Sequence, residues 1–148
     1  MIFIAHRGNI NGPNIERENT EEYILEALYK GYDCEIDLWV IDDILYLGHD
    51  DPMYKTSKEF ILNNSNNLWI HCKNHEALQY LINTDTNYFY HDKDNYTITS
   101  KNVIWGNINS EIINNMICVM PEKYIQYINK SQLLKCIGIC TDYINCYV

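Results

Sequence analysis

Short apolar runs alternate with polar segments along the chain, and this pattern predicts alternating strands and helices. Residues 2–5 predict a first strand, and Thr20 can cap a helix that ends at Gly31. Residues 34–39 predict a second strand, and Asp42-Asp43 marks the tip of a hairpin that returns over 44–47. Helices are then expected over 55–63 and 75–82, and strands over 68–72, 87–90, 103–105, 117–120 and 137–141.

This alternation favours a parallel β/α architecture. In the second half, however, the strand starts at Leu68, Asn87, Val103 and Ile117 lie only 19, 16 and 14 residues apart. A βαβ unit with a full helix takes about 30 residues, so helices there must be single turns or absent. Our hypothesis is that the uncovered strand surface is buried against a second copy of the chain, in a homo-oligomer.

Composition and net charge limit the classes of binding partner and the cellular compartment that we expect. A formal net charge of −9 argues against nucleic acid or an anionic membrane as the main partner. Six scattered cysteines without a Cys-x-x-Cys pair are interpreted as buried free thiols, which indicates a reducing, cytoplasmic location. Residues 1–4 are too short for a signal peptide, and no apolar stretch approaches the roughly 20 residues of a transmembrane segment.

Paired carboxylates are the first sign of chemistry. Glu35 and Asp37 lie two residues apart in a predicted strand and therefore share a face, as do His71 and Lys73. Two close carboxylates repel unless a cation lies between them. We therefore expect a divalent metal held by Glu35, Asp37 and His71. Oxygen ligands suit Mg²⁺, Ca²⁺ or Mn²⁺, and the imidazole favours a transition metal such as Mn²⁺.

Two histidines at the ends of apolar runs are the candidate catalysts. An imidazole near its usual pKa of 6.5 can hold or release a proton near neutrality, so His6 and His49 are the candidate acid/base pair. Arg7 and Lys73 are the candidate phosphate-binding residues, because their charges would neutralise a phosphate group.

The order His6-Arg7-Gly8, Glu18-Asn19-Thr20, Glu35-x-Asp37 and His49-Asp50 resembles the glycerophosphodiester phosphodiesterase family, within the phospholipase C-like phosphodiesterase superfamily. The resemblance implies a TIM barrel, a divalent metal on the two carboxylates of Glu-x-Asp, and the two motif histidines as the acid/base pair. It also places Glu18 in the site as a supporting group. Thr141-Asp142-Tyr143 is similar to a segment that commonly ends the family's barrel. We therefore expect a single α/β domain over residues 1–148, a compact TIM-like (β/α) barrel with reduced or missing helices in its second half.

One departure from the family concerns the third strand. The family usually has an acidic residue, any residue and Lys there, whereas this chain has His71-Cys72-Lys73. The third metal ligand would then be an imidazole, or it would be lost. The short segment between Asp50 and Leu68 leaves little room for the insertion that shapes glycerol recognition in longer relatives, so the substrate head group stays open.

The function expected from these features is metal-dependent hydrolysis of a phosphodiester of the glycerophosphodiester or lysophospholipid type, by an enzyme of lipid metabolism acting on a small substrate. One alternative is a non-catalytic module that binds a phosphate ligand. Another is a phospholipase D-like enzyme that releases a cyclic phosphate. His91, Trp105 and Glu122 are secondary candidates, for which a strand-end polar pair, a core aromatic and a helix cap are the plainer interpretations.

Overall fold

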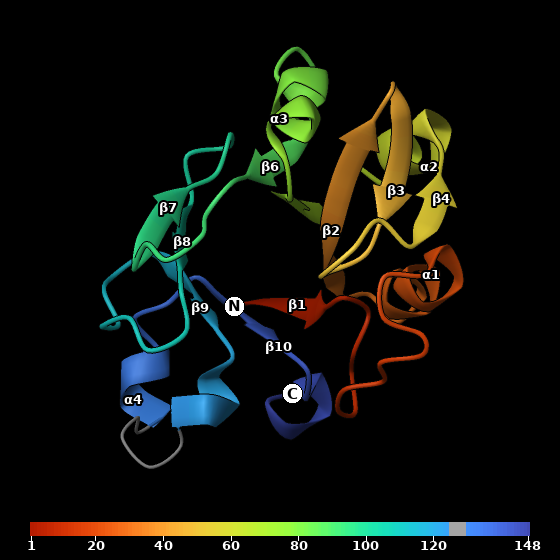
Figure 1. Cartoon of the computed structure of the whole chain (residues 1–148). Coiled ribbons are helices and arrows are strands. Elements are labelled where there is room, and N and C mark those ends of the chain that lie inside the picture. Colours follow the sequence, from red (N-terminus) through yellow and green to blue (C-terminus); the bar gives the residue numbers. More distant parts are fainter. Residues whose placement is uncertain (125–129) are drawn as a thin grey trace.

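The computed structural model of the chain describes residues 1–124 and 130–148, whose strands form one curled sheet (Figure 1). The strands are β1 (Ile2–His6), β2 (Asp33–Ile41), β3 (Ile44–Leu47), β4 (Tyr54–Thr56), β5 (Leu68–Cys72), β6 (Asn87–Phe89), β7 (Tyr96–Ile98), β8 (Ile104–Gly106), β9 (Met116–Val119) and β10 (Gly138–Thr141). The helical segments are α1 (Glu21–Tyr29), α2 (Lys58–Asn63), α3 (His75–Leu81) and α4 (Lys130–Leu133), with 3-10 turns η1 (Pro121–Tyr124) and η2 (Ile144–Cys146).

Parallel pairing dominates the sheet. The parallel strands follow the order β6-β5-β2-β1-β10-β9-β8, so the first and last strands of the chain are neighbours. β2 is the longest strand. Its first part pairs with β1, and its second part pairs antiparallel with β3, which in turn pairs with β4. β7 pairs antiparallel with β8.

The predicted TIM-like barrel is wrong. A TIM barrel closes eight parallel strands, each followed by a helix. This sheet is a mixed half-barrel, and within the described residues no strand ladder joins β6 to β7 or β8. The described α-helices number four and have only 9, 6, 7 and 4 residues. The physical reason is chain length, because spacings of 14 to 19 residues cannot hold a strand, a full helix and two connections.

Individual hydrogen bonds hold the β7–β8 hairpin beside β6 in place of a ladder. The amide of Ser100 donates to the carbonyl of Tyr88 at 2.8 Å, and the hydroxyl of Thr97 donates to the carbonyl of Tyr90 at 3.0 Å. β7 itself was not expected from the sequence. The three residues of β7 alternate too briefly to produce a periodic signal.

Local signals in the first half are confirmed. The hydroxyl of Thr20 accepts from the amide of Tyr23 at 3.3 Å and so caps α1, which ends before Gly31 at φ +85°. Asp42 and Asp43 both adopt positive φ, 49° and 61°, as a two-residue hairpin turn requires. The helix expected over 55–63 begins only at Lys58, because residues 54–56 extend the sheet as β4.

Alternation along the strands separates an inner from an outer face. On β2, Ile36 and Leu38 are fully buried on the outer face against α1 and α3, in a cluster with strands β1 and β5. On the inner face, a second apolar cluster fills the curl of the sheet beside the polar side chains. Its members are Ile4, Trp69, Phe89, Trp105, Ile117, Val119, Met120 and Cys140.

Two isoleucines on β2 test this partition. Ile36 is fully buried and Ile41 is 40% exposed. Ile36→Ala should lower the free energy of unfolding by about 2–5 kcal/mol, because it removes buried methyl groups and leaves a cavity. Ile41→Ala is the matched control and should cost less than about 1 kcal/mol. Urea denaturation measures both, and equal losses would contradict the burial of Ile36 on the outer face.

Candidate functional site

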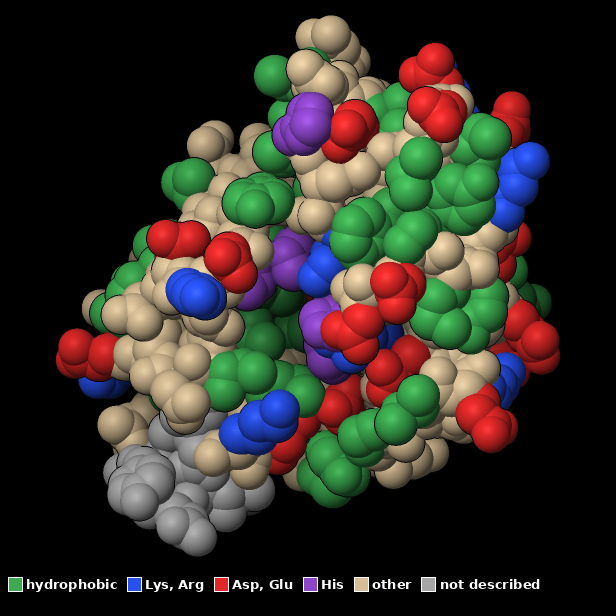
Figure 2. All heavy atoms as spheres, viewed as in Figure 1, with side chains coloured by type: hydrophobic (Ala, Val, Ile, Leu, Met, Phe, Trp, Pro, Cys, Tyr) green, Lys and Arg blue, Asp and Glu red, His purple; other side chains and the backbone are tan. Residues whose placement is uncertain are grey.

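All eight residues expected to carry function lie together. A cavity of about 490 Å³ lies where β1, β2, β5 and β6 end, on the inner side of the sheet. Figure 2 shows histidine side chains in a hollow of this face, beside acidic and basic groups. His6, Arg7, Glu18, Glu35, Asp37, His49 and His71 line the cavity, and the Lys73 ammonium lies 3.7 Å from a carboxylate oxygen of Asp37.

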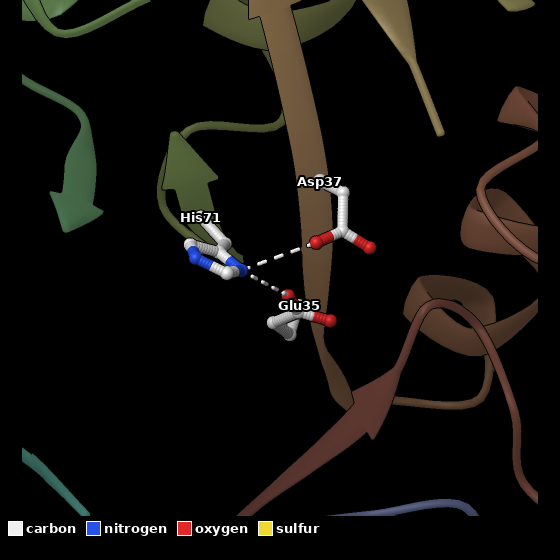
Figure 3. A group of neighbouring side chains, drawn as sticks. All are labelled: Glu35, Asp37 and His71. Carbon is white, nitrogen blue, oxygen red and sulfur yellow. Dashed lines mark hydrogen bonds and ion pairs between the residues drawn. The ribbon is translucent and has the colours of Figure 1, made fainter. Parts of the chain in front are cut away.

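The core of the site is the trio of Glu35, Asp37 and His71 (Figure 3). β2 presents both carboxylates on one face, and the parallel register places His71 of β5 directly beside Asp37. His71 Nδ1 lies 3.1 Å from Asp37 Oδ1 and 3.9 Å from Glu35 Oε1. One ligand atom from each residue lies within 4.8 Å of the others, so the three side chains can hold a single ion.

The two carboxylates have opposite electrostatic environments. Burial and the charge of Asp37 raise the pKa of Glu35. Burial would also raise the pKa of Asp37, but the basic groups around it, His49, His71 and Arg7, outweigh burial and hold that pKa well below its usual range. Asp37 is therefore ionised, whereas burial and the repulsion between the two carboxylates raise the pKa of Glu35.

Asparagine and arginine contacts fix Asp37 in place. The Asn19 side chain donates to Asp37 Oδ2 at 2.9 Å and accepts from the Asp37 amide at 3.0 Å. The Arg7 Nε lies 3.1 Å from the same Oδ2. Arg7 reaches this position because its backbone is left-handed, with φ 56°, where the chain leaves β1. These contacts leave Asp37 Oδ1 as the oxygen that faces His71.

The trio fits a divalent cation on two observations. Glu35 Oε2 is buried and makes no hydrogen bond, although a buried carboxylate oxygen normally has a partner. Among the described groups of the site, the carboxylates of Glu18, Glu35, Asp37 and Asp142 exceed the permanent cations Arg7 and Lys73 that contact them by two charges. A divalent ion would supply both the missing partner and the missing charge.

His6 is held by an aspartate that the sequence interpretation did not assign. His6 Nδ1 lies 2.8 Å from Asp142 Oδ1, and its Nε2 lies 4.0 Å from Glu35 Oε2. Burial lowers the pKa of His6, but the bond with Asp142 and the charge of Glu35 outweigh it, so the pKa is raised. Asn9 donates to Asp142 at 2.8 Å and to Glu18 at 2.8 Å, and so orients both carboxylates.

His49 reaches the other end of the carboxylate pair from the loop after β3. Its Nδ1 lies 3.3 Å from Asp37 Oδ2 and 2.6 Å from an Arg7 guanidinium nitrogen. An arginine only donates, so Nδ1 of His49 accepts and the ring proton lies on Nε2. The turn needs Gly48, because a Cβ there would lie 2.1 Å from the carbonyl oxygen of Asp51. The His49 side chain is 41% exposed and borders the cavity.

The opposite wall of the cavity is largely apolar. Phe89 and Trp105 are buried there with ring centroids 4.4 Å apart, and His91 stacks on His71 at 4.6 Å. Two secondary candidates, His91 and Trp105, thus border the site. Glu122 instead accepts from the Thr141 hydroxyl at 2.7 Å and from the Asp142 amide at 3.1 Å, so it fixes the chain after β10.

Asn9, Asn19 and Asp142 are the functional contacts that sequence reasoning missed. Asn19 and Asp142 stand inside motifs that were noticed, and Asp142 directly follows the last strand, where site residues of parallel sheets gather. That position was the available signal for Asp142.

No helix among the described residues has the length and hydrophobicity needed to cross a bilayer.

Comparison of the chain with family models, with curated proteins and with solved structures finds no match in any of the three. The resemblance to glycerophosphodiester phosphodiesterases therefore stays a prediction that rests on the four motifs and their spacing.

The repulsion between the Glu35 and Asp37 carboxylates should be measurable as a change in melting temperature. Glu35→Gln removes one of two repelling buried charges, so the metal-free variant should melt about 3 °C higher than the native chain. An excess of divalent ion should raise the melting temperature of the native chain but not that of the variant, because binding to the folded state alone stabilises it.

Glu59→Gln, on the exposed side of α2, is the matched control and should change neither quantity. Differential scanning calorimetry with and without the ion measures both effects. A metal-free Glu35→Gln protein that melts below the native chain would contradict the described electrostatics.

Proposed function

We propose that the protein hydrolyses a small phosphodiester, of the glycerophosphodiester or lysophospholipid type, with a divalent ion held by Glu35, Asp37 and His71. The observation that carries the proposal is that His6 contacts Glu35 and His49 contacts Asp37, so two imidazoles flank one buried carboxylate pair. Cleavage of a phosphodiester needs one group to activate the attacking oxygen and another to protonate the leaving oxygen.

The cationic side chains of Arg7 and Lys73 are the proposed phosphate-binding groups. A divalent ion, when bound, polarises the phosphate as a Lewis acid. Arg7 and Lys73, which directly follow β1 and β5, contact Asp37 and would hold the phosphate oxygens. Glu18 accepts from the Arg7 guanidinium at 3.2 Å and keeps it in place. These two cations would also stabilise the charge that develops on the phosphate during cleavage.

His6 is the proposed general base. Asp142 is ionised, because the hydrogen bond from His6 outweighs burial and lowers its pKa. It therefore accepts from Nδ1 of His6, which leaves the lone pair of Nε2 free toward the site. At this atom His6 would take a proton from water or from a neighbouring substrate hydroxyl.

His49 is the proposed general acid. Because its Nδ1 accepts from Arg7, its proton lies on Nε2, and the half-exposed ring borders the cavity. To act as an acid, the ring must first take up a second proton at Nδ1, where Asp37 lies 3.3 Å away as an acceptor. The imidazolium would then give its Nε2 proton to the leaving alkoxide and return to the neutral ring. The two histidines thus carry different tautomers, and each tautomer is set by the partner at Nδ1.

We further propose a cytoplasmic location, since all six cysteines are free and five of them are buried. The homo-oligomer stays a prediction, and sedimentation at micromolar concentration tests it. A strict monomer would contradict it.

Replacement of either histidine should stop turnover. His6→Ala and His49→Ala are each expected to lower kcat by about 100-fold to 10,000-fold, the usual contribution of a general acid or base. His75→Ala, at an exposed position on α3, is the matched control and should leave kcat unchanged. Phosphorus NMR of glycerophosphocholine and lysophosphatidylcholine, incubated with Mn²⁺, Mg²⁺ or Ca²⁺, measures the product.

Each outcome of this assay separates one function from the others. A phosphate monoester supports hydrolysis, and a cyclic phosphate indicates the phospholipase D-like reaction. No product with any ion, together with retained binding of the substrate, would replace the enzyme by a phosphate-binding module. Near-native turnover of both histidine variants would refute the acid/base assignment.

If Asp142 sets the tautomer of His6, its replacement should lower kcat without unfolding the protein. Asp142→Asn can still meet His6 but favours the wrong tautomer, so kcat should fall about 100-fold or more while substrate KM changes little. Asp92→Asn is the matched control, since this exposed aspartate also follows a strand end. Steady-state kinetics and a circular dichroism melt distinguish this effect from unfolding, and a selective rise in KM would contradict it.

A further inference from the structure

We infer that the Glu35–Asp37–His71 centre selects a transition-metal dication, with Zn²⁺ bound more tightly than Mn²⁺, over Mg²⁺ and Ca²⁺, and that the backbone carbonyl of His91 sets this preference by fixing the His71 tautomer. The inference rests on the metal site of the proposed function and is independent of the reaction catalysed there.

The tautomer follows from the contact at the far nitrogen of the ring. His71 Nε2 lies 3.3 Å from the carbonyl oxygen of His91. A carbonyl only accepts, so Nε2 carries the proton. In the neutral ring, Nδ1 then carries the lone pair, and this atom is the one that faces Asp37 and Glu35. A ring whose second N–H is bound by a backbone carbonyl is the usual arrangement of a metal-ligating histidine.

Stacking holds the ring in this orientation. His71 lies between Phe89, with centroids 5.2 Å apart and planes 6° from parallel, and His91, at 4.6 Å and 10°. The ring is also buried between strands β5 and β6. Rotation of the ring out of its plane would break both stacks, and a 180° flip within the plane would remove the bond to the His91 carbonyl.

A positive species must lie between this nitrogen and the carboxylates. In the metal-free chain it is a proton on Nδ1 that is donated to Asp37, and a bound metal ion would displace this proton and take the lone pair of Nδ1. Mg²⁺ and Ca²⁺ prefer shells made of oxygen, whereas Zn²⁺ and other transition ions accept imidazole nitrogen readily. Three protein ligands that border an open cavity also match catalytic zinc sites, which keep one position for water or substrate. The competing interpretation of the same geometry is that His71 keeps this proton and forms an ion pair with Asp37.

Binding measurements test the preference directly. Competition against a fluorescent chelator should show Zn²⁺ and Mn²⁺ bound about 100-fold or more tighter than Mg²⁺ and Ca²⁺. His71→Glu should reduce the ratio of Mn²⁺ to Mg²⁺ affinity at least about tenfold, because it replaces the nitrogen by a third carboxylate. His75→Gln is the matched control and should leave the ratio unchanged.

Spectroscopy on the native chain keeps the test independent of any variant that fails to fold. With Mn²⁺, electron spin-echo spectra should show modulation from one imidazole ¹⁴N. With Zn²⁺, ¹⁵N NMR should show His71 Nδ1 bound to metal and Nε2 still protonated. Mn²⁺ spectra without nitrogen modulation, a His71 protonated at both nitrogens in excess Zn²⁺, or Mg²⁺ affinity within tenfold of Mn²⁺ would overturn the inference.

These outcomes are distinguishable from failure of the proposed function. Zn²⁺ or Mn²⁺ bound through His71 without cleavage of any phosphodiester would leave the metal preference standing and refute the enzyme. Cleavage supported equally by Mg²⁺ and Mn²⁺, with equal affinities, would do the reverse.

Discussion

The repulsion between two buried carboxylates on one face of β2 is the constraint on which the site depends. Glu35 and Asp37 point the same way because the side chains of a strand repeat every second residue. Basic groups gather around Asp37 and keep it ionised, whereas Glu35 has a buried oxygen without a partner. The negative charge of Asp37 is therefore compensated by neighbouring groups, whereas that of Glu35 is compensated less. That asymmetry marks the place where a cation, if bound, would lower the free energy of the site.

The parallel register converts this local repetition into a three-dimensional centre. His6 pairs with Glu35 across β1 and β2, and Asp37 pairs with His71 across β2 and β5, so three strands contribute one layer of ionisable groups. Apolar side chains such as Ile4 and Trp69 pack beside these groups on the inner side of the sheet, and Trp69 pairs in register with Glu35. The strands thus fix the carboxylates and two imidazoles rigidly, and the loops add Arg7, Glu18 and His49 around them.

The sequence predicted most elements of the first half, with β4 as the exception, and all the ionisable residues of the site except Asp142, because these features are local. Strand alternation, the Thr20 cap and the Asp42-Asp43 turn act over a few residues. Closure of the sheet is not local: a TIM-like barrel was expected from motifs, but the edges of β6 and β7 are not joined by a ladder. Likewise, the partner of His6 lies 136 residues away, and the His91 carbonyl is a backbone group without a side-chain signal.

The position of the site within the sheet explains how so short a chain can hold it. β1 and β2 have a parallel neighbour on each side, and β10 lies between β1 and β9. β6, β7 and β8, which no helix separates, lie at or next to the edges of the sheet and contribute the apolar wall with Phe89 and Trp105. The scarcity of helices in the second half therefore leaves the strands that hold the carboxylates, His6 and His71 in the interior of the sheet. Under the proposed function, we expect substitutions in the apolar wall to alter which phosphodiester is accepted before they alter how the proposed metal is held.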